Sequence, residues 1–156
     1  MTKELDDVVI TSALRTPIGT YRGSLKEISA DKLGSICIKE VIENSKLKAD
    51  DIEQVVMGQV LTAAAGQNPA RQALVNAGIP VSKPAHIVNQ LCGSGLRAVA
   101  SAYQSVKLKE NKIVIAGEDR RYNFRKNRRQ KRRNSKAGRP NYQRYGHIGE
   151  EINQWN

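Results

Sequence analysis

The sequence predicts an α/β domain built on a mostly parallel sheet with helices on both faces. Four short apolar runs alternate with stretches whose apolar residues recur at helical spacing, which is the pattern of strand–helix–strand units. Such units give parallel strands, and their helices cover both faces of the sheet. The pattern ends after residue 117, so we expect a domain over residues 1–117 and a separate basic tail over residues 118–156.

The N-terminal quarter of the chain is expected to supply one strand and one helix. The strand is the apolar run 8–13, which the sequence Arg15-Thr16-Pro17 closes because proline biases the residue before it toward extended geometry. The helix begins at Ser29, a good N-cap residue. Its apolar positions share helical spacing and are expected to face the core; they are Leu33, Ile36, Cys37 and Val41.

The middle of the chain repeats this alternation. Residues 52–60 contain a short apolar run before Gly58 and are expected to form the second strand. The pair Asn68-Pro69 predicts the start of a helix, because asparagine caps helices and proline is tolerated at the first helical position. The apolar stripe of this helix consists of Ala70, Ala73, Leu74 and Ala77.

The third strand is expected over residues 85–91, followed by a helix over residues 95–108 and a fourth strand over residues 112–116. The helix is rich in alanine and small on one face, which permits close packing against a sheet. The predicted sheet therefore has four strands.

One cysteine stands where the third strand gives way to its helix. Cys92 is followed by Gly93 and Gly95, and the helical pattern begins at once. This order places the thiol at a helix N-terminus, where the unpaired amides and the helix dipole favour a thiolate. A thiolate can attack an acyl carbonyl, and ligands of parallel sheets bind at the carboxyl ends of the strands. The alternative is a buried structural cysteine that acts as a small hydrophobic residue.

Five segments carry a resemblance to a known family. They are VVITSALRTPIG (8–19), GQVL (58–61), GQNPARQ (66–72), NQLCGSGL (89–96) and IVIAG (113–117). In this order and spacing, residues 6–117 resemble the N-terminal part of a thiolase, and the resemblance implies acetyl-CoA acetyltransferase chemistry. It implies acyl transfer between CoA thioesters through an acyl-enzyme on Cys92, with no metal or redox cofactor. It also implies acyl-CoA partners and assembly as homodimers or tetramers.

The chain departs from the family in two respects. The family's histidine base and second cysteine lie in segments resembling Asn-Glu-Ala-Phe, Gly-His-Pro and Cys-Gly-Gly-Gly, none of which occurs here. The family's Ala-Gly-Gly-x-Glu becomes Ala116-Gly117-Glu118-Asp119-Arg120, which is the kind of change that a frameshift produces. We therefore expect a truncated chain that is inactive alone. It could also be one half of a split enzyme whose exposed apolar surface meets a second polypeptide.

The tail holds most of the net charge of +11. Residues 118–156 carry 12 Lys/Arg against 4 Asp/Glu, whereas residues 1–117 carry 14 against 11. All 12 cations lie within residues 120–144, and such a charged, apolar-poor segment is expected to be disordered. The alternative function is nucleic-acid binding through residues 120–144. The run 145–156 resembles part of the family's loop domain and would place His147 in its CoA pocket.

Other features restrict the chemistry. Cys37 and Cys92 have no metal-ligand spacing between them, so no metal site is expected. His86 precedes Cys92 within the same predicted strand and is expected to be structural or at the surface. The sequence shows no apolar leader and no run long enough to span a membrane, from which we expect a cytoplasmic protein with no membrane partner.

Overall fold

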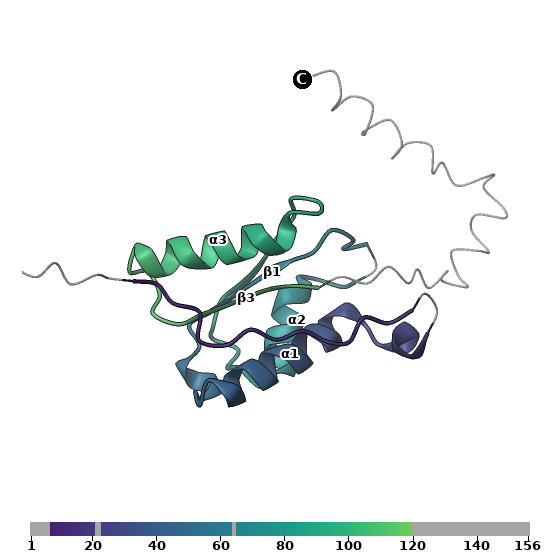
Figure 1. The fold of residues 1–156 in the computed structure, drawn as a ribbon, viewed down its shortest axis with the longest axis horizontal. Coiled ribbons are helices and arrows are strands. Elements are labelled where there is room, and N and C mark those ends of the chain that lie inside the picture. The colour runs from purple at the N-terminus through teal and green to yellow at the C-terminus, as the bar shows by residue number, and fades with distance from the viewer. Residues whose placement is uncertain (1–6, 21–22, 64, 120–156) are drawn as a thin grey trace, which may run out of the picture. The chain divides into compact units, whose positions relative to one another are not determined.

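The structure is a computed structural model that describes residues 7–20, 23–63 and 65–119. Two short 3-10 helices, η1 (Ser24–Glu27) and η2 (Ala49–Asp51), flank the first long helix, α1 (Ala30–Asn44). Strand and helix then alternate through β1 (Gln54–Gly58), α2 (Pro69–Asn76), β2 (Ala85–Val88), α3 (Ser94–Lys107) and β3 (Val114–Glu118), as Figure 1 shows. The predicted α/β class is confirmed. The tail from residue 120 onward, including His147, lies outside the described residues.

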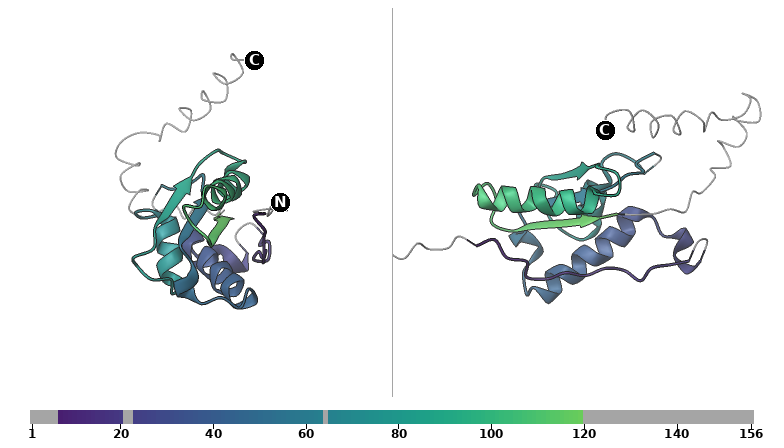
Figure 2. Two further views of the ribbon diagram at one scale, coloured as in Figure 1. Left: turned by 90° about the vertical axis from the view of Figure 1, so that its left-hand side faces the viewer. Right: turned by 45° about the horizontal axis from the view of Figure 1, so that its top comes forward.

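The sheet is parallel throughout its described part, with strand order β2-β1-β3. Val55 of the central strand pairs with Ala85 on one side and with Ile115 on the other. Helices α1 and α2 cover one face and α3 covers the other, as two views of the ribbon show (Figure 2). Both predictions, a parallel sheet and helices on both faces, are confirmed.

The prediction of a strand over residues 8–13 is wrong, and with it the predicted total of four strands. The described sheet has three strands, and residues 7–20 form no regular element. Val9 is 71% exposed and Ile10 is 77% exposed, although both belong to the apolar run. An apolar run becomes a strand only where a neighbouring edge pairs with its backbone. Here the segment passes beside α1, and the Thr11 and Ser45 hydroxyls lie 3.4 Å apart.

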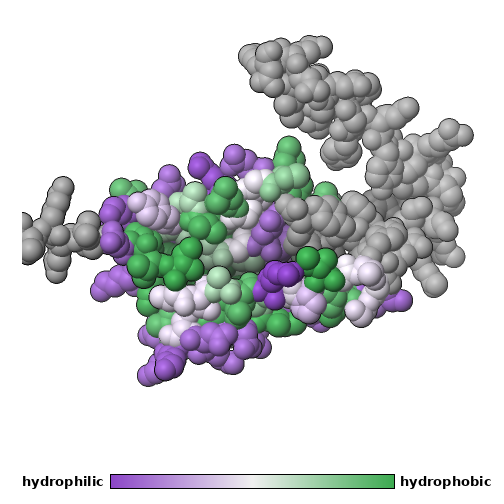
Figure 3. Space-filling model, viewed as in Figure 1, coloured by the Kyte–Doolittle hydropathy of each residue, from purple (hydrophilic) through white to green (hydrophobic). Residues whose placement is uncertain are grey.

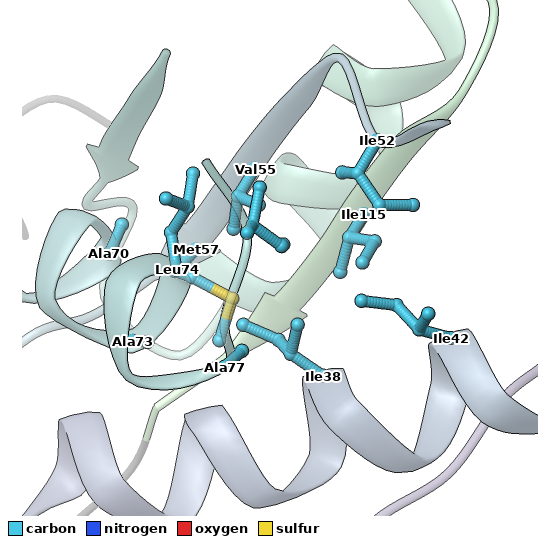
Figure 4. Close-up of a cluster of buried hydrophobic side chains, with 11 residues drawn as sticks. Ile38, Ile42, Ile52, Val55, Met57, Ala70, Ala73, Leu74, Ala77 and Ile115 are labelled. Carbon is cyan, nitrogen blue, oxygen red and sulfur yellow. The ribbon is translucent and has the colours of Figure 1, made fainter. Parts of the chain in front are cut away.

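The main core lies between the sheet and helices α1 and α2. Figure 4 shows Val55 and Met57 of β1 pointing toward Ile38 of α1 and Leu74 of α2. The predicted stripe of α2 is confirmed, since Ala70, Ala73, Leu74 and Ala77 are all buried. Leu74 is among the largest of the side chains that are fully buried.

The face of α1 that points into the core is shifted by one position along the helix from the predicted face. Gly34, Ile38 and Ile42 are buried, whereas Ile36 is 54% exposed and Cys37 is half-buried rather than in the core. Both sets of residues have helical spacing, so the periodicity alone does not choose between them. The choice depends on Gly34, because a side chain there would collide with Asp119 at the end of β3.

Helix α3 packs closely on the opposite face of the sheet through its small residues. Ser94, Ala98, Ala102 and Ser105 are its buried positions, which confirms the predicted small face. Its outer side is apolar and exposed at Leu96 (77%), Val99 and Tyr103 (50%). Figure 3 shows apolar residues gathered on the face of the molecule where α3, β3 and the N-terminal segment lie. Among the described residues, no helix has the length and hydrophobicity needed to cross a membrane.

Candidate active site around Cys92

Cys92 lies in the short turn that joins β2 to α3, at the carboxyl edge of the parallel sheet. Strand β2 ends at Val88, Gly93 is the N-cap residue of α3, and the helix begins at Ser94. The predicted placement of the thiol beside a helix N-terminus is confirmed. The side chain is exposed, which excludes the alternative of a buried structural cysteine.

Two polar side chains hold this turn from either end. The Asn89 amide accepts a hydrogen bond from the Leu91 backbone N–H (3.1 Å) and donates one to the Val60 carbonyl (3.3 Å), which ties the turn to the loop after β1. The Ser94 hydroxyl accepts from the Gln90 N–H (2.9 Å) and donates to the Leu91 carbonyl (2.6 Å). Because Ser94 is fully buried, its hydroxyl end of these bonds is shielded from competing water.

The residue before the cysteine has a strained backbone. Leu91 has a φ of +49°, in the left-handed region that costs a non-glycine residue about 1–2 kcal/mol. The side chain is 60% exposed, so burial of Leu91 offsets little of this cost. Two backbone hydrogen bonds maintain this conformation: the Gly93 N–H donates to the Gln90 carbonyl (3.0 Å), and the Ser94 N–H donates to the Leu91 carbonyl (3.1 Å). Strain of this kind is concentrated at functional sites in proteins.

The first turn of α3 rests directly on the backbone of the central strand. A Cβ added to Gly58 would lie 2.6 Å from the Ser94 carbonyl carbon and 2.8 Å from the Gly95 nitrogen. On the neighbouring strand, the Glu118 carboxylate approaches Gly95, where an added Cβ would lie 2.7 Å from Oε2. A carboxylate beside a helix N-terminus interacts favourably with the helix dipole. The position of the Cys92 turn is therefore fixed by the ends of β1 and β3.

The other motif residues that the structure describes have structural roles. Asn68 caps α2 by accepting a hydrogen bond from the Arg71 N–H (3.1 Å), as predicted, and its amide also donates to the Ala85 carbonyl (2.9 Å). The Arg71 guanidinium donates to the carbonyls of Val81 and Lys83 and so orders the loop before β2. Their contacts organise the edge of the sheet rather than the thiol.

His86 is the only histidine of the described part of the chain. It lies on β2, paired with Val56, and its side chain is exposed, which agrees with the expected surface role. His147 and its expected CoA contact fall outside the described residues. Within residues 7–119 as described, no three His, Cys, Asp or Glu side chains cluster as metal ligands, and the expectation of a metal-free site stays a prediction.

Two buried polar residues on the other side of the sheet were not predicted from the sequence. Gln59 directly follows β1 and Asp119 directly follows β3, and they are 3% and 4% exposed. Burial raises the pKa of Asp119 to about 7, and the Asp31 carboxylate adds to the shift. Polar residues directly after apolar strands are the signal that could have marked them as residues of the sheet edge.

Residues 8–142 match the family model for the thiolase N-terminal domain, which includes nearly all of the stretch 6–117 and continues beyond it. The chain is 48% identical over 113 residues to an acetyl-CoA acetyltransferase of Cupriavidus necator, covering 72% of this chain and 29% of that protein.

Two solved structures show the same architecture. The chain aligns with the Bacillus anthracis acetyl-CoA acetyltransferase at a TM-score of 0.68 and 30% identity, over 70% of this chain and 28% of that one. It aligns with the Acat5 thiolase from Ascaris suum, solved in complex with coenzyme A, at a TM-score of 0.62 and 36% identity, over 63% and 26% of the two chains. The chain thus spans less than a third of the length of each of these relatives.

Proposed function

Because the chain belongs to the thiolase family, we propose that Cys92 accepts an acyl group from a CoA thioester in an acyl transfer between CoA thioesters. The observation that carries this proposal is the exposed thiol on a turn that the buried Ser94 hydroxyl holds at the N-terminus of α3. A nucleophile needs access to its substrate together with a fixed position, and this turn supplies both.

The proposed step is a thioester exchange at the acyl carbonyl. The Cys92 sulfur forms a bond to the carbonyl carbon, the carbon–sulfur bond to CoA breaks, and the Cys92 proton leaves with the CoA thiol. Negative charge develops on the carbonyl oxygen during attack, and backbone N–H groups at a helix start are suited to stabilise it. We assign the Cys92 N–H as one of these donors.

Complete turnover requires groups beyond the described residues. A base must take the thiol proton, and an acid/base must act at the α-carbon of the second substrate. His86 lies on β2 before the turn, and Cys37 lies in α1 on the opposite face of the sheet from α3. We propose that the chain by itself lacks turnover and that the apolar outer side of α3 receives the part of the enzyme that completes the site. Homo-oligomeric assembly and a cytoplasmic location belong to the same proposal.

Acylation of the 156-residue chain tests the nucleophile directly. The chain is incubated with acetyl-CoA, quenched and digested, and the peptides containing Cys92 and Cys37 are compared by mass spectrometry. We expect an acetyl group on Cys92 that hydroxylamine removes, and none in Cys92→Ser. Iodoacetamide, which needs no CoA recognition, is expected to alkylate Cys92 as well.

Cys37 is the matched control within the same molecule. Burial raises the pKa of the Cys37 thiol, a backbone hydrogen bond with Thr16 lowers it in part, and the Asp119 carboxylate raises it again. The raised pKa reduces the thiolate fraction of Cys37, so we expect Cys37 to react with acetyl-CoA and iodoacetamide more slowly than the exposed Cys92. Alkylation of Cys92 without acetylation, or equal acetylation of both cysteines, would refute the proposed role. Steady thiolysis of acetoacetyl-CoA by the chain would contradict the absence of turnover.

A further inference from the structure

Within the described part of the chain, two buried oxygen atoms at the carboxyl end of the sheet have no hydrogen-bond partner. They are Oε1 of Gln59 and Oδ2 of Asp119, and both side chains are more than nine-tenths buried. The Gln59 amide nitrogen donates to the Leu61 carbonyl (3.2 Å), so only its oxygen is left unpaired. Buried polar atoms in folded proteins are nearly always paired, because an unpaired one loses its bonds to water and gains nothing in return.

The strand register makes these two residues neighbours. Gly58 pairs with Glu118, and the Asp119 N–H donates to the Gly58 carbonyl (2.9 Å). Gln59 and Asp119 are therefore the next residues along two adjacent parallel strands. Their backbones lie about 5 Å apart, as in any paired strands, which is within reach of both side chains.

The two side chains also lie on the same face of the sheet. Met57 belongs to the core beneath α1 and α2, and the alternation along a strand places Gln59 on that face as well. Asp119 contacts Gly34 of α1, which puts its carboxyl group on this face too. The two unpaired oxygens thus belong to neighbouring side chains on the face of the sheet that α1 covers.

Two oxygen acceptors cannot bond to each other, but a proton on the carboxyl group turns it into a donor. We propose that Asp119 is a protonated carboxylic acid that donates a hydrogen bond to Oε1 of Gln59, forming a pH-sensitive latch between the ends of β1 and β3. Both unpaired oxygens then take part in a single hydrogen bond. No additional ligand is needed.

The surroundings of Asp119 favour its neutral form. Burial raises its pKa to about 7, and Asp31 contributes by charge repulsion. Among the residues that the structure describes, the titratable groups that act with Asp119 both come from α1. They are the Cys37 thiol and the Asp31 carboxylate, which accepts a hydrogen bond from the Asn76 amide of α2 (3.2 Å). Directly after β1, its neighbour is the neutral amide of Gln59. The fold therefore holds the latch closed below neutral pH.

Opening the latch would affect the turn that carries Cys92. Loss of the proton leaves a buried carboxylate facing an amide oxygen, which is repulsive. Gln59 is followed by Val60, whose carbonyl receives the Asn89 hydrogen bond that anchors the turn. Raising the pH through 7 is therefore expected to loosen the sheet end under the proposed nucleophile.

The first test compares the pH dependence of unfolding of the 156-residue chain and of Asp119→Asn. The asparagine amide can still donate to Gln59 but does not titrate. In the wild type the folded state holds a proton that the unfolded state releases near pH 3.8, so stability falls as pH rises from about 4 to 7. Relative to the variant, the wild-type unfolding constant should rise about tenfold per pH unit, or roughly 1,000-fold over this window. Parallel curves for the two proteins would overturn the proposal.

The second test identifies the acceptor. The Asp119 carboxyl carbon is followed by NMR in the wild type and in Gln59→Met, which keeps the length of the side chain but removes its oxygen. Losing an acceptor for the neutral acid should lower the apparent pKa of Asp119 by about 0.5–1 unit. Replacing an amide with an apolar group would otherwise leave that pKa unchanged or raise it. An unchanged or higher value would therefore exclude Gln59 as the partner.

Discussion

Replacing Gly58 with alanine should displace the helix that carries the proposed nucleophile. The new Cβ would lie 2.6–2.8 Å from three backbone atoms of Ser94 and Gly95, whereas carbon atoms in contact are about 3.5 Å apart. The first turn of α3 would have to retreat by about 0.8 Å. Backbone atoms of a packed helix cannot rotate away, so we expect a loss of about 2–3 kcal/mol in the free energy of unfolding.

The matched control is Gly117→Ala on the neighbouring strand. Gly117 pairs with Met57, and its added Cβ would meet only the end of the Met57 side chain at 3.3 Å. This side chain can adjust, so we expect a change within about 1 kcal/mol. Urea unfolding measures both variants, and the rate of Cys92 alkylation reports on the turn. Equal losses for the two glycines, or an unchanged alkylation rate in a destabilised Gly58→Ala, would show that the contact with α3 does not fix the turn.

Two further substitutions test the turn and the core. Ser94→Ala removes both hydroxyl hydrogen bonds of a fully buried side chain and should lower the free energy of unfolding by about 1–3 kcal/mol. Hydrogen exchange at the Gln90 N–H should become faster, and an unchanged exchange rate would mean that water replaces the hydroxyl. Leu74→Ala opens a cavity in the core and should lower the free energy of unfolding by about 2–5 kcal/mol. The neighbouring Val75 is 43% exposed, so Val75→Ala should change this free energy by no more than about 0.5 kcal/mol. Similar losses at both positions would mean that α2 is not anchored through Leu74.

Local patterns in the sequence were sufficient for most of the elements. The helix cap at Asn68, the buried stripe of α2 and the small face of α3 depend on residues within one or two turns of each other, so the sequence predicts them directly. The position of Cys92 was predictable for the same reason, because the end of a strand and the start of a helix are adjacent in the chain. The family resemblance rests on the same local motifs.

Features that depend on residues far apart in the chain appeared only in the tertiary structure. The run 8–13 has the composition of a strand but no paired edge, and the choice between two helical faces of α1 depends on a contact between Gly34 and Asp119. The pairing of β1 with β3 brings Gln59 beside Asp119, which are 60 positions apart, and buries both. The sequence by itself therefore determined most of the elements and the place of the thiol. Strand pairing and packing decided which apolar residues are buried and which polar groups meet, because both depend on which distant segments come into contact.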